Sequence, residues 1–338
     1  MRGASRNVEC DAMRRLIPAL AGICICMAVT CRAHPASEDV NRIRVAGGTP
    51  DGTFSLIANG LASIFTEYVP QVSAASIQTT GTSDNLDFVE TGQAECGIGS
   101  ADLVYAARVR GTTKVAQPHT HLRGLAVLFP QTVHLTTRAG SGLTRLGDLA
   151  GKRIAAGIPG DVSVSGRGFR LDGIAAAITA VSLRHARPET LVLRMDDAVD
   201  KLGRGEIDAA HFYGGHPFPP VTQAAERYGI HLIEFDDLAL SLVKETYPFS
   251  KAVIIPAGTY SGQLSAVRTI GIDNVLFCRS DLPADLVYRL TLTLFERLEH
   301  IASVHTSARQ INPETAPATP IPLHEGAARY YRERELFR

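Results

Sequence analysis

The sequence predicts an α/β protein built as two lobes. Strand and helix patterns alternate in the order β-α-β-α-β over residues 43–99, and a β-α-β order returns over residues 191–212. Two further extended segments, 132–138 and 274–279, flank the second unit. Short buried strands that alternate with helices are the pattern of a parallel sheet. At 338 residues the chain is also longer than a typical domain of ~100–200 residues.

The first unit opens with a short buried strand at residues 43–46. A helix is expected from about Phe54 to Tyr68, because its apolar residues recur at helical spacing and Pro70 ends it. Ser83 or Asp84 is expected to cap a second helix. The other boundaries predicted here are a loop at 47–53, a strand at 72–78, a turn at 79–82, a helix stop at Gly92 and a strand at 96–99.

The second unit is predicted to repeat this arrangement. It has a strand at 191–193, a helix at 196–202 that Gly203 stops, and a strand at 207–212. In both units a glycine, an acidic turn and a strand of small residues follow the helix. Because ligands sit at the carboxyl ends of strands in open parallel sheets, we expect the loops after these strands to carry the site.

The C-terminal part of the chain is predicted to return to the first lobe. A long helix, from Pro283 to about His300, is expected to pack there. Residues 312–323 contain four prolines, which exclude a helix or a central strand, so this piece is expected to run over the surface. A short helix follows, ending near residues 329–333.

The extended segments define the predicted domain limits. If the chain leaves the first lobe near 131 and returns near 275, lobe 1 comprises residues 37–131 and 275–338, and lobe 2 comprises residues 132–274. The strands near 132–138 and 274–279 would then form a hinge between them.

The N-terminal segment fits a secretory signal. From Met13 onward, two arginines precede the apolar run Leu16 to Thr30, and small residues follow it. Residues 1–12 are an extension upstream of this pattern, and cleavage fits after Ala33 or after Ala36. We therefore expect residues 1–36 to be a signal peptide and the protein to be periplasmic. A membrane anchor and a lipid anchor at Cys31 are the alternatives.

Composition excludes several classes of protein. Lysine plus arginine and aspartate plus glutamate balance at 34 each, so no basic field favours nucleic acid. Four of the six cysteines, at positions 10, 24, 26 and 31, precede the predicted cleavage sites, which leaves Cys96 and Cys278. Both fall in predicted buried strands, where a thiol behaves as a small apolar side chain, and a disulfide between them stays open.

No catalytic or metal-binding pattern is found. The loop at 47–52 lacks the dinucleotide-binding spacing, residues 151–153 lack the features of a phosphate loop, and Ser163 and Ser165 lie in a serine-rich loop without a nucleophile elbow. The eleven histidines match no zinc spacing. We expect no catalytic residue, no metal and no cofactor. His216, after a predicted strand end, is the histidine expected nearest the cleft.

Two polar turns indicate an anion site. Residues 48–53 and 80–83 each lead into a helix, whose first N–H groups and positive dipole end attract a carboxylate or phosphate. The hydroxyls of Thr53, Thr82 and Ser83 can add donors. These residues could instead only cap their helices. Two such turns after successive strands favour a site.

A set of motifs in fixed order points to a known family. They are residues 46–49 with 52–53, 80–86, 92–98, 100–102, 141–143 with 148–153, 205–209, 214–217, 256–260 and 324–331. Together they resemble the TAXI-type solute-binding proteins of TRAP (tripartite ATP-independent periplasmic) transporters, over nearly the whole chain after the signal.

The resemblance implies a two-lobed periplasmic-binding-protein-like (type II) fold with a central cleft. It implies a monomeric receptor that closes on a small organic acid or amino acid, such as glutamate or 2-oxoglutarate, and delivers it to a TRAP-type permease. The implied ligand-binding positions are Gly48, Thr53, Phe54, Thr82, Ser83, Asn85, Ser100 and Asp102 in the first lobe, and the loop at 160–165 with Ser163 and Ser165, then Tyr213, Gly215 and His216, in the second.

Two departures from the family pattern concern the ligand. Pro50, Asp51 and Phe54 stand where the family has glycines and a tyrosine, and Asp161 interrupts a loop of serine and glycine. Added carboxylates near an anion site are unfavourable, so the ligand is expected to be less acidic than glutamate or to carry an amine.

Two other classes of function stay open. A secreted enzyme could use the same framework, with Asp51, Asp102, Asp161 and His216 as candidate acids or bases, although no pair of them has a catalytic signature. A receptor that signals to a membrane sensor is the other alternative, and an adjacent permease gene would separate transport from signalling.

Overall fold

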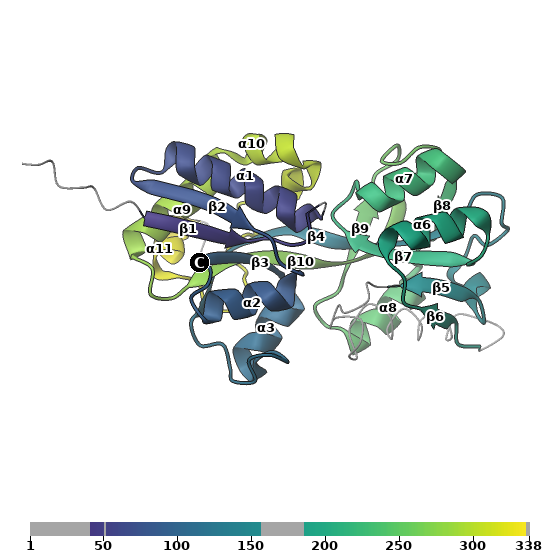
Figure 1. Cartoon of the computed structure of the whole chain (residues 1–338), viewed down its shortest axis with the longest axis horizontal. Coiled ribbons are helices and arrows are strands. Elements are labelled where there is room, and N and C mark those ends of the chain that lie inside the picture. The colour runs from purple at the N-terminus through teal and green to yellow at the C-terminus, as the bar shows by residue number, and fades with distance from the viewer. Residues whose placement is uncertain (1–40, 51, 157–185, 336–338) are drawn as a thin grey trace, which may run out of the picture. The chain divides into compact units, whose positions relative to one another are not determined.

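The computed structural model describes residues 41–50, 52–156 and 186–335. Within them, ten strands form one mixed sheet in the order β2-β1-β3-β10-β4-β7-β5-β6, with β8 paired to β4 and β9 to β10 (Figure 1). The strands are β1 (Asn41–Ala46), β2 (Val72–Ile77), β3 (Cys96–Ser100), β4 (Leu122–Arg138), β5 (Arg153–Ala156), β6 (Glu189–Leu191), β7 (Ala209–Gly214), β8 (Ile230–Leu232), β9 (Lys251–Ile255) and β10 (Val267–Arg279).

Helices cover the sheet. They are α1 (Thr53–Tyr68), α2 (Thr82–Glu90), α3 (Ala101–Arg110), α6 (Met195–Arg204), α7 (Pro219–Tyr228), α8 (Asp237–Thr246), α9 (Ala284–Glu296), α10 (Leu298–Val304) and α11 (Glu325–Glu333), with 3-10 turns η1 (Leu146–Leu149) and η2 (Thr306–Gln310). Among the described residues, none of these helices is long and apolar enough to cross a membrane.

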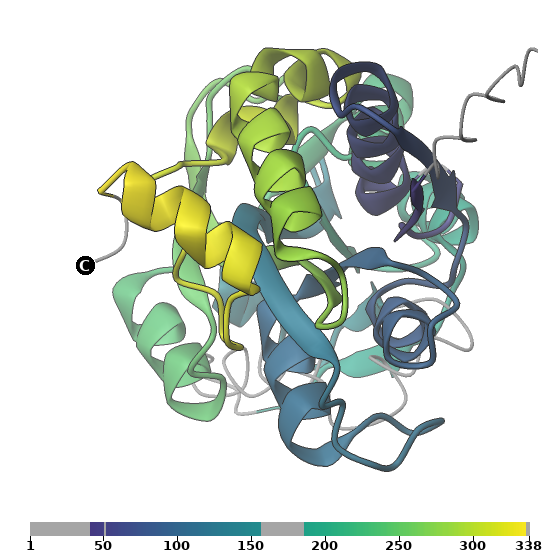
Figure 2. The same ribbon diagram turned by 90° about the vertical axis from the view of Figure 1, so that its left-hand side faces the viewer.

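The first group of strands, β2-β1-β3, is parallel. One buried cluster joins apolar residues of these strands to α1, α9 and α11, and a second joins α2 and α3 to other positions of the sheet. Figure 2 shows α11 crossing α9, against which it packs. The helices therefore cover both faces, as expected for strands that are apolar on each side.

Two long antiparallel strands, β4 and β10, join this group to the second one (Figure 1). The late part of β10 pairs with β3 on one side and with the early part of β4 on the other. Residues 132–138 of β4 pair with β7 and β8, and residues 267–271 of β10 pair with β9. The predicted crossover strands are thus confirmed, as is the α/β class. Both strands are longer than predicted, because each serves two groups of strands.

The second group consists of β7, β5 and β6, which are parallel to one another. A third buried cluster packs α6 and α7 against it. All described residues beyond Glu38 belong to one compact unit, and the lobe limits 37–131 with 275–338, and 132–274, stay a prediction.

Several predicted boundaries are wrong. The cap of α2 is Gly81 and not Ser83 or Asp84, since the helix already begins at Thr82. Gly203 lies inside α6, which ends at Gly205 in the left-handed conformation with a φ of 73°. The helix expected from Pro283 to about His300 is interrupted at Arg297, which has a φ of −120°, and continues to Val304. The patterns also did not predict α3.

The proline-rich segment does not simply run over the surface. It lies along β4, where the amides of Gly124 and Val127 donate to the carbonyls of Pro322 and Ala316. Ala316 and Ile321 are buried. The carbonyl of a proline accepts a hydrogen bond as readily as that of any other residue. This segment can therefore cover the open edge of β4 although it forms no strand.

The predicted signal segment at 1–36 and the loop at 160–165, with Ser163 and Ser165, lie outside the described residues, as do Asp51 and Asp161.

Candidate functional site

The site is built at the carboxyl ends of parallel strands. Strands β1 and β3 are neighbours, and they lead directly into α1 and α3, while β2 leads into α2. Parallel strands end at the same edge of a sheet, so the first turns of the three helices gather there. The turns also bind one another, since the Thr79 amide donates to the Gly48 carbonyl at 3.2 Å.

None of the three helices has a side-chain cap. The capping positions are Gly52, Gly81 and Ser100, and none of them accepts a hydrogen bond from its helix with a side chain. The Ser100 hydroxyl donates instead to a carboxylate oxygen of Asp102. Uncapped first turns keep their N–H groups and their positive dipole end available to an anion.

Thr53 is the most informative of the predicted site residues. It is only 3% exposed, and its hydroxyl has no hydrogen-bond partner among the described residues. Gly215 approaches it closely: a Cβ atom at Gly215 would lie 2.9 Å from the Thr53 methyl group and 2.4 Å from the Ser307 hydroxyl. The start of α1 thus meets the loop after β7 and the turn η2, which brings two of the predicted site residues, Thr53 and Gly215, together.

Thr82 and Ser83 begin α2. The Thr82 hydroxyl accepts a hydrogen bond from the Ser100 amide at 3.2 Å, which links the starts of α2 and α3. Ser83 is half-buried. Asp84, in the same turn, binds the Thr80 amide at 3.0 Å and forms an ion pair with Lys114. Burial alone would raise the pKa of Asp84, but the hydrogen bonds from Lys114 and Thr80 outweigh it and lower the pKa.

Asn85 is fully occupied within the protein. Its side-chain NH₂ donates to the carbonyls of Gly47 and Ile98, the latter at 2.7 Å, and its carbonyl accepts from the Thr79 hydroxyl at 2.6 Å. The side chain is completely buried. Asn85 therefore ties the ends of β1 and β3 to the turn before α2. Its role in this geometry is to position these segments.

The remaining predicted residues differ in their surroundings. The Phe54 side chain belongs to the buried cluster beneath α1, and Gly48 is buried with its Cα beside Phe54. Asp102 is half-buried beside Ser100. Tyr213 is half-buried on β7, opposite Val133 of β4.

His216, in the loop after β7, is hydrogen-bonded to both β4 and η2. Its Nε2 lies 3.3 Å from the amide nitrogen of Gln310, which donates to it, so Nδ1 carries the proton and donates to Thr132 at 3.1 Å. The Ser307 hydroxyl donates to the His216 carbonyl at 3.1 Å. Burial, and then the neighbouring His305, lower the pKa of His216 to about 4. The imidazole is therefore neutral at pH 7.

A second buried histidine anchors the same loop from beneath. The Phe218 amide donates to the Tyr260 hydroxyl at 2.9 Å, and this hydroxyl forms a hydrogen bond with His134 Nε2 at 2.7 Å. Burial, and then His216, lower the pKa of His134 to about 3, so the imidazole stays neutral. This chain of hydrogen bonds fixes the start of α7.

Several residues that shape the site were not predicted from the sequence: Thr132, His134, Tyr260, Ser307 and Gln310. Thr132 and His134 lie two apart on a predicted crossover strand, so their common face was a signal that could have been read. Ser307 and Gln310 lie far along the chain, in a segment without a motif.

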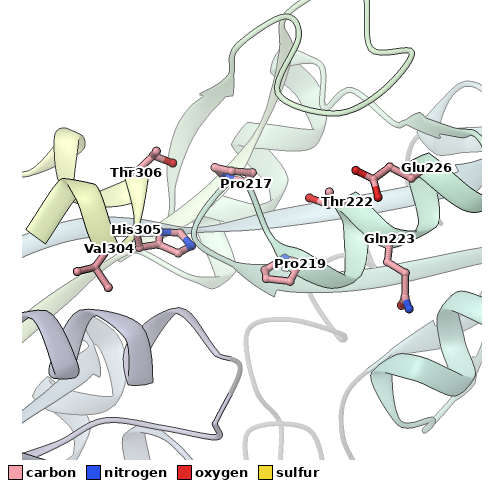
Figure 3. A pocket seen from close by; sticks show the side chains of 8 residues that line it. All are labelled: Pro217, Pro219, Thr222, Gln223, Glu226, Val304, His305 and Thr306. Carbon is pink, nitrogen blue, oxygen red and sulfur yellow. The ribbon is translucent and has the colours of Figure 1, made fainter.

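A pocket of about 440 Å³ opens beside the His216 loop (Figure 3). It lies between α7 and the junction of α10 with η2, and its lining residues are Pro217, Pro219, Thr222, Gln223, Glu226, Val304, His305 and Thr306. Figure 3 shows His305 next to Pro217. Within the described ranges, no three histidine, cysteine or acidic side chains are arranged to hold a metal ion.

A family model matches most of the chain. The model is that of the NMT1-like family, and it covers residues 45–334. The chain belongs to the NMT1-like family. The match includes the starts of α1, α2 and α3, the His216 loop and η2, so every part of the candidate site lies inside the region that defines this NMT1-like protein.

Solved structures similar to this NMT1-like protein are distant. A TctC solute-binding protein from Polaromonas is 13% identical, over 87% of this chain and 95% of that one, with a TM-score of 0.48. The alkanesulfonate-binding protein SsuA from Xanthomonas axonopodis pv. citri is 12% identical, over 88% and 94%, at 0.44. The aliphatic sulphonate-binding protein SsuA from Escherichia coli is 10% identical, over 87% and 88%, at 0.46.

Proposed function

We propose that this protein is an extracytoplasmic solute-binding protein. It captures a small organic anion or amino acid between the first turns of α1, α2 and α3 and the loop of Gly215 and His216. The site has donors from backbone N–H groups and hydroxyls, and the buried histidines around it are neutral. Such a set of fixed donors favours a carboxylate or another oxyanion.

The observation that carries this proposal is the buried Thr53 hydroxyl. A buried polar group without a partner costs about 1–3 kcal/mol, so such groups are rare and call for an explanation. Thr53 occupies the first turn of an uncapped helix and is covered by Gly215 from the other end of the site. A ligand oxygen at this helix start would accept from the Thr53 hydroxyl and from the helix N–H groups together.

The charges around the site limit the ligand. Asp84 is neutralised by Lys114, whereas Asp102 lies half-buried at the start of α3 and accepts a hydrogen bond from the Ser100 hydroxyl, with no cation paired to it among the described residues. A second negative charge on the ligand would be repelled by Asp102, while an amine would be attracted to it. We therefore favour an amino acid or a monocarboxylate such as a 2-oxo acid over a dicarboxylate.

The test is a thermal-shift and calorimetry screen of the purified protein. Amino acids, monocarboxylates, dicarboxylates and short sulfonates form the panel, because the same N–H and hydroxyl groups can donate to any of these oxyanions. A ligand that binds the folded state raises the melting temperature by mass action. If no member of the panel changes it, the proposed ligand class is wrong.

Substitutions at Thr53 make the test specific. Thr53→Val keeps the shape and removes the hydroxyl, and should weaken binding about ten- to a hundredfold, the cost of one hydrogen bond to a charged group. The melting temperature without ligand should be unchanged or higher, because the variant no longer buries an unpaired hydroxyl. Thr53→Ser retains the hydroxyl and is the matched control. Equal affinity of Thr53→Val and wild type would remove Thr53 from the binding site.

The proposed partner is a TRAP-type permease, and the proposed location is the periplasm. The support is the resemblance of the motifs to TAXI-type receptors and the signal pattern that begins at Met13. N-terminal sequencing of exported protein should give a start between Cys31 and Ser37, and an intact apolar run would contradict cleavage of the signal. A neighbouring gene for a multi-span permease, rather than for a sensor kinase, is expected.

A further inference from the structure

The two cysteines that remain after the predicted cleavage face each other in the sheet. Cys96 is the first residue of β3, and Cys278 is the penultimate residue of β10. The two strands are antiparallel, and their register places Cys278 directly opposite Cys96. Residues directly opposite in a sheet have side chains on the same face. Both cysteines accordingly belong to the same buried cluster, under α1 and α9.

The backbone hydrogen bonds show which kind of pair this is. The Arg279 amide donates to the Glu95 carbonyl, on the β3 side, at 3.0 Å, and the Ser280 amide donates to the His121 carbonyl, on the β4 side, at 2.7 Å. Since amide directions alternate along a strand, the Cys278 amide points to β4 and away from Cys96. Cys96 and Cys278 therefore form a non-hydrogen-bonded pair, in which side chains are closest.

We propose that Cys96 and Cys278 are a redox pair that forms a cross-strand disulfide when the protein folds in an oxidising compartment. The Cα separation of a non-hydrogen-bonded pair, about 4.5 Å, falls within the range of about 4.4–6.8 Å found for disulfides. Both residues are free thiols in this structure. The occurrence of the bond in the cell rests on the export proposed above, whereas its formation in vitro does not.

The oxidant is a low-molecular-weight or protein disulfide. One cysteine thiolate attacks a sulfur of this disulfide, forms a mixed disulfide and releases one thiol. The second cysteine thiolate then displaces the other thiol and closes the Cys96–Cys278 bond. The two protons lost by the cysteines end on the two released thiols, and the oxidant takes up both electrons.

The reaction has to occur before the core closes. Both cysteines are completely buried, and burial raises the pKa of each thiol, so the folded protein presents neither a thiolate nor access to an oxidant. During folding the thiols are accessible, and pairing of β10 with β3 brings them together. The bond would link the two chain segments that build this part of the sheet, and everything between β3 and β10 would lie inside the closed loop.

The experiment compares two orders of addition with the whole chain. In the first, denatured and reduced protein refolds in a glutathione redox buffer. In the second, reduced folded protein receives the same buffer. Proteolysis without reduction, followed by mass spectrometry, identifies linked peptides. A Cys96–Cys278 peptide should form in the first order and be at least tenfold less abundant in the second.

The readouts separate the proposal from its alternatives. The oxidised wild type should melt about 5–10 °C above the reduced wild type, because the bond closes a long loop in the unfolded chain. Cys278→Ala should show no such difference between oxidising and reducing conditions, whatever its own stability. Refolding that yields no Cys96–Cys278 peptide, or that links either residue to a cysteine of the N-terminal segment instead, would overturn the proposal. Peptide mapping of the wild type decides this even if the variant fails to fold.

Discussion

At the scale of single residues, two polar side chains at one edge of the sheet behave in opposite ways. Asn85 uses its NH₂ group and its carbonyl on Gly47, Ile98 and Thr79, and Thr53 has no partner among the described residues. Both are buried. A saturated group stabilises the apo protein and holds the turns in place, whereas an unsatisfied group is a cost that a ligand can remove.

Removing the Asn85 side chain should therefore affect stability first. Asn85→Ala leaves the buried carbonyls of Gly47 and Ile98 without their donor, so the free energy of unfolding should fall by about 2–4 kcal/mol. Denaturant unfolding monitored by circular dichroism measures it. Asn59→Ala, at an exposed position of α1, is the control and should cost less than about 0.5 kcal/mol. A loss at Asn85 no larger than that at Asn59 would contradict the positioning task.

At the scale of elements, two glycines inside helices have different reasons to be there. A Cβ atom at Gly203 of α6 would lie 2.4 Å from the ring of Tyr228 at the end of α7. A Cβ atom at Gly60 of α1 would lie 3.5 Å from Ile301 of α10, an ordinary contact. Gly203 thus permits the close packing of α6 on α7. This packing explains why a glycine stands inside α6, where no helix end requires one.

The two glycines give a paired prediction. Alanine in a helix interior is favoured over glycine by about 1 kcal/mol, so Gly60→Ala should stabilise the protein or leave it unchanged. Gly203→Ala should instead destabilise it by about 1–3 kcal/mol, since the Tyr228 ring has to move. Melting temperatures of the two variants check this. Stabilisation by Gly203→Ala would mean that α6 and α7 do not pack as closely as described.

At the scale of the whole molecule, buried histidines make stability depend on pH. Burial lowers the pKa of His216 to about 4 and of His134 to about 3, and it also lowers the pKa of His305 and His324. These side chains come from β4, the loop after β7 and the capping residues just before η2 and α11. Protonation would place uncompensated charge where distant parts of the chain meet.

The sign of this effect follows from proton binding. The unfolded state takes up a proton at each histidine near pH 6.5, and the folded state does so only near pH 4 at His216, so stability is full above pH 6.5 and falls as the pH decreases from 6.5 to 4. Between pH 6 and 5, His216 should contribute up to about 1.4 kcal/mol per pH unit. Urea unfolding at pH 7, 6 and 5 measures the slope.

A matched pair of variants isolates His216. His216→Gln should make the slope of unfolding free energy against pH shallower by up to that amount, and His231→Gln, at an exposed position, should leave it unchanged. Equal slopes for wild type and His216→Gln would mean that His216 is protonated in the folded protein as readily as in the unfolded one. Carboxylates with lowered pKa values, such as Asp84 and Glu95, change their effect on stability only at lower pH. They therefore do not alter the slope between pH 7 and 5.

The sequence alone determined the parts of this protein that depend on local periodicity. The strands near 43–46 and 96–99, helix α1 and the crossover strands follow from alternation of apolar residues and from turn formers, because these patterns record burial and backbone bonding within one element. Thr53 follows a strand end, where a site was expected, whereas Gly215 was named only through the family resemblance.

Only the tertiary structure decided which partner each side chain meets. No local pattern distinguishes the unpaired hydroxyl of Thr53 from the saturated amide of Asn85, or indicates that Ser307 and Gln310 bind His216 from a segment more than ninety positions away. The pairing of Cys96 with Cys278 likewise depends on strand register. Register and packing are set by contacts between segments far apart in the chain, so they emerge only when the elements assemble.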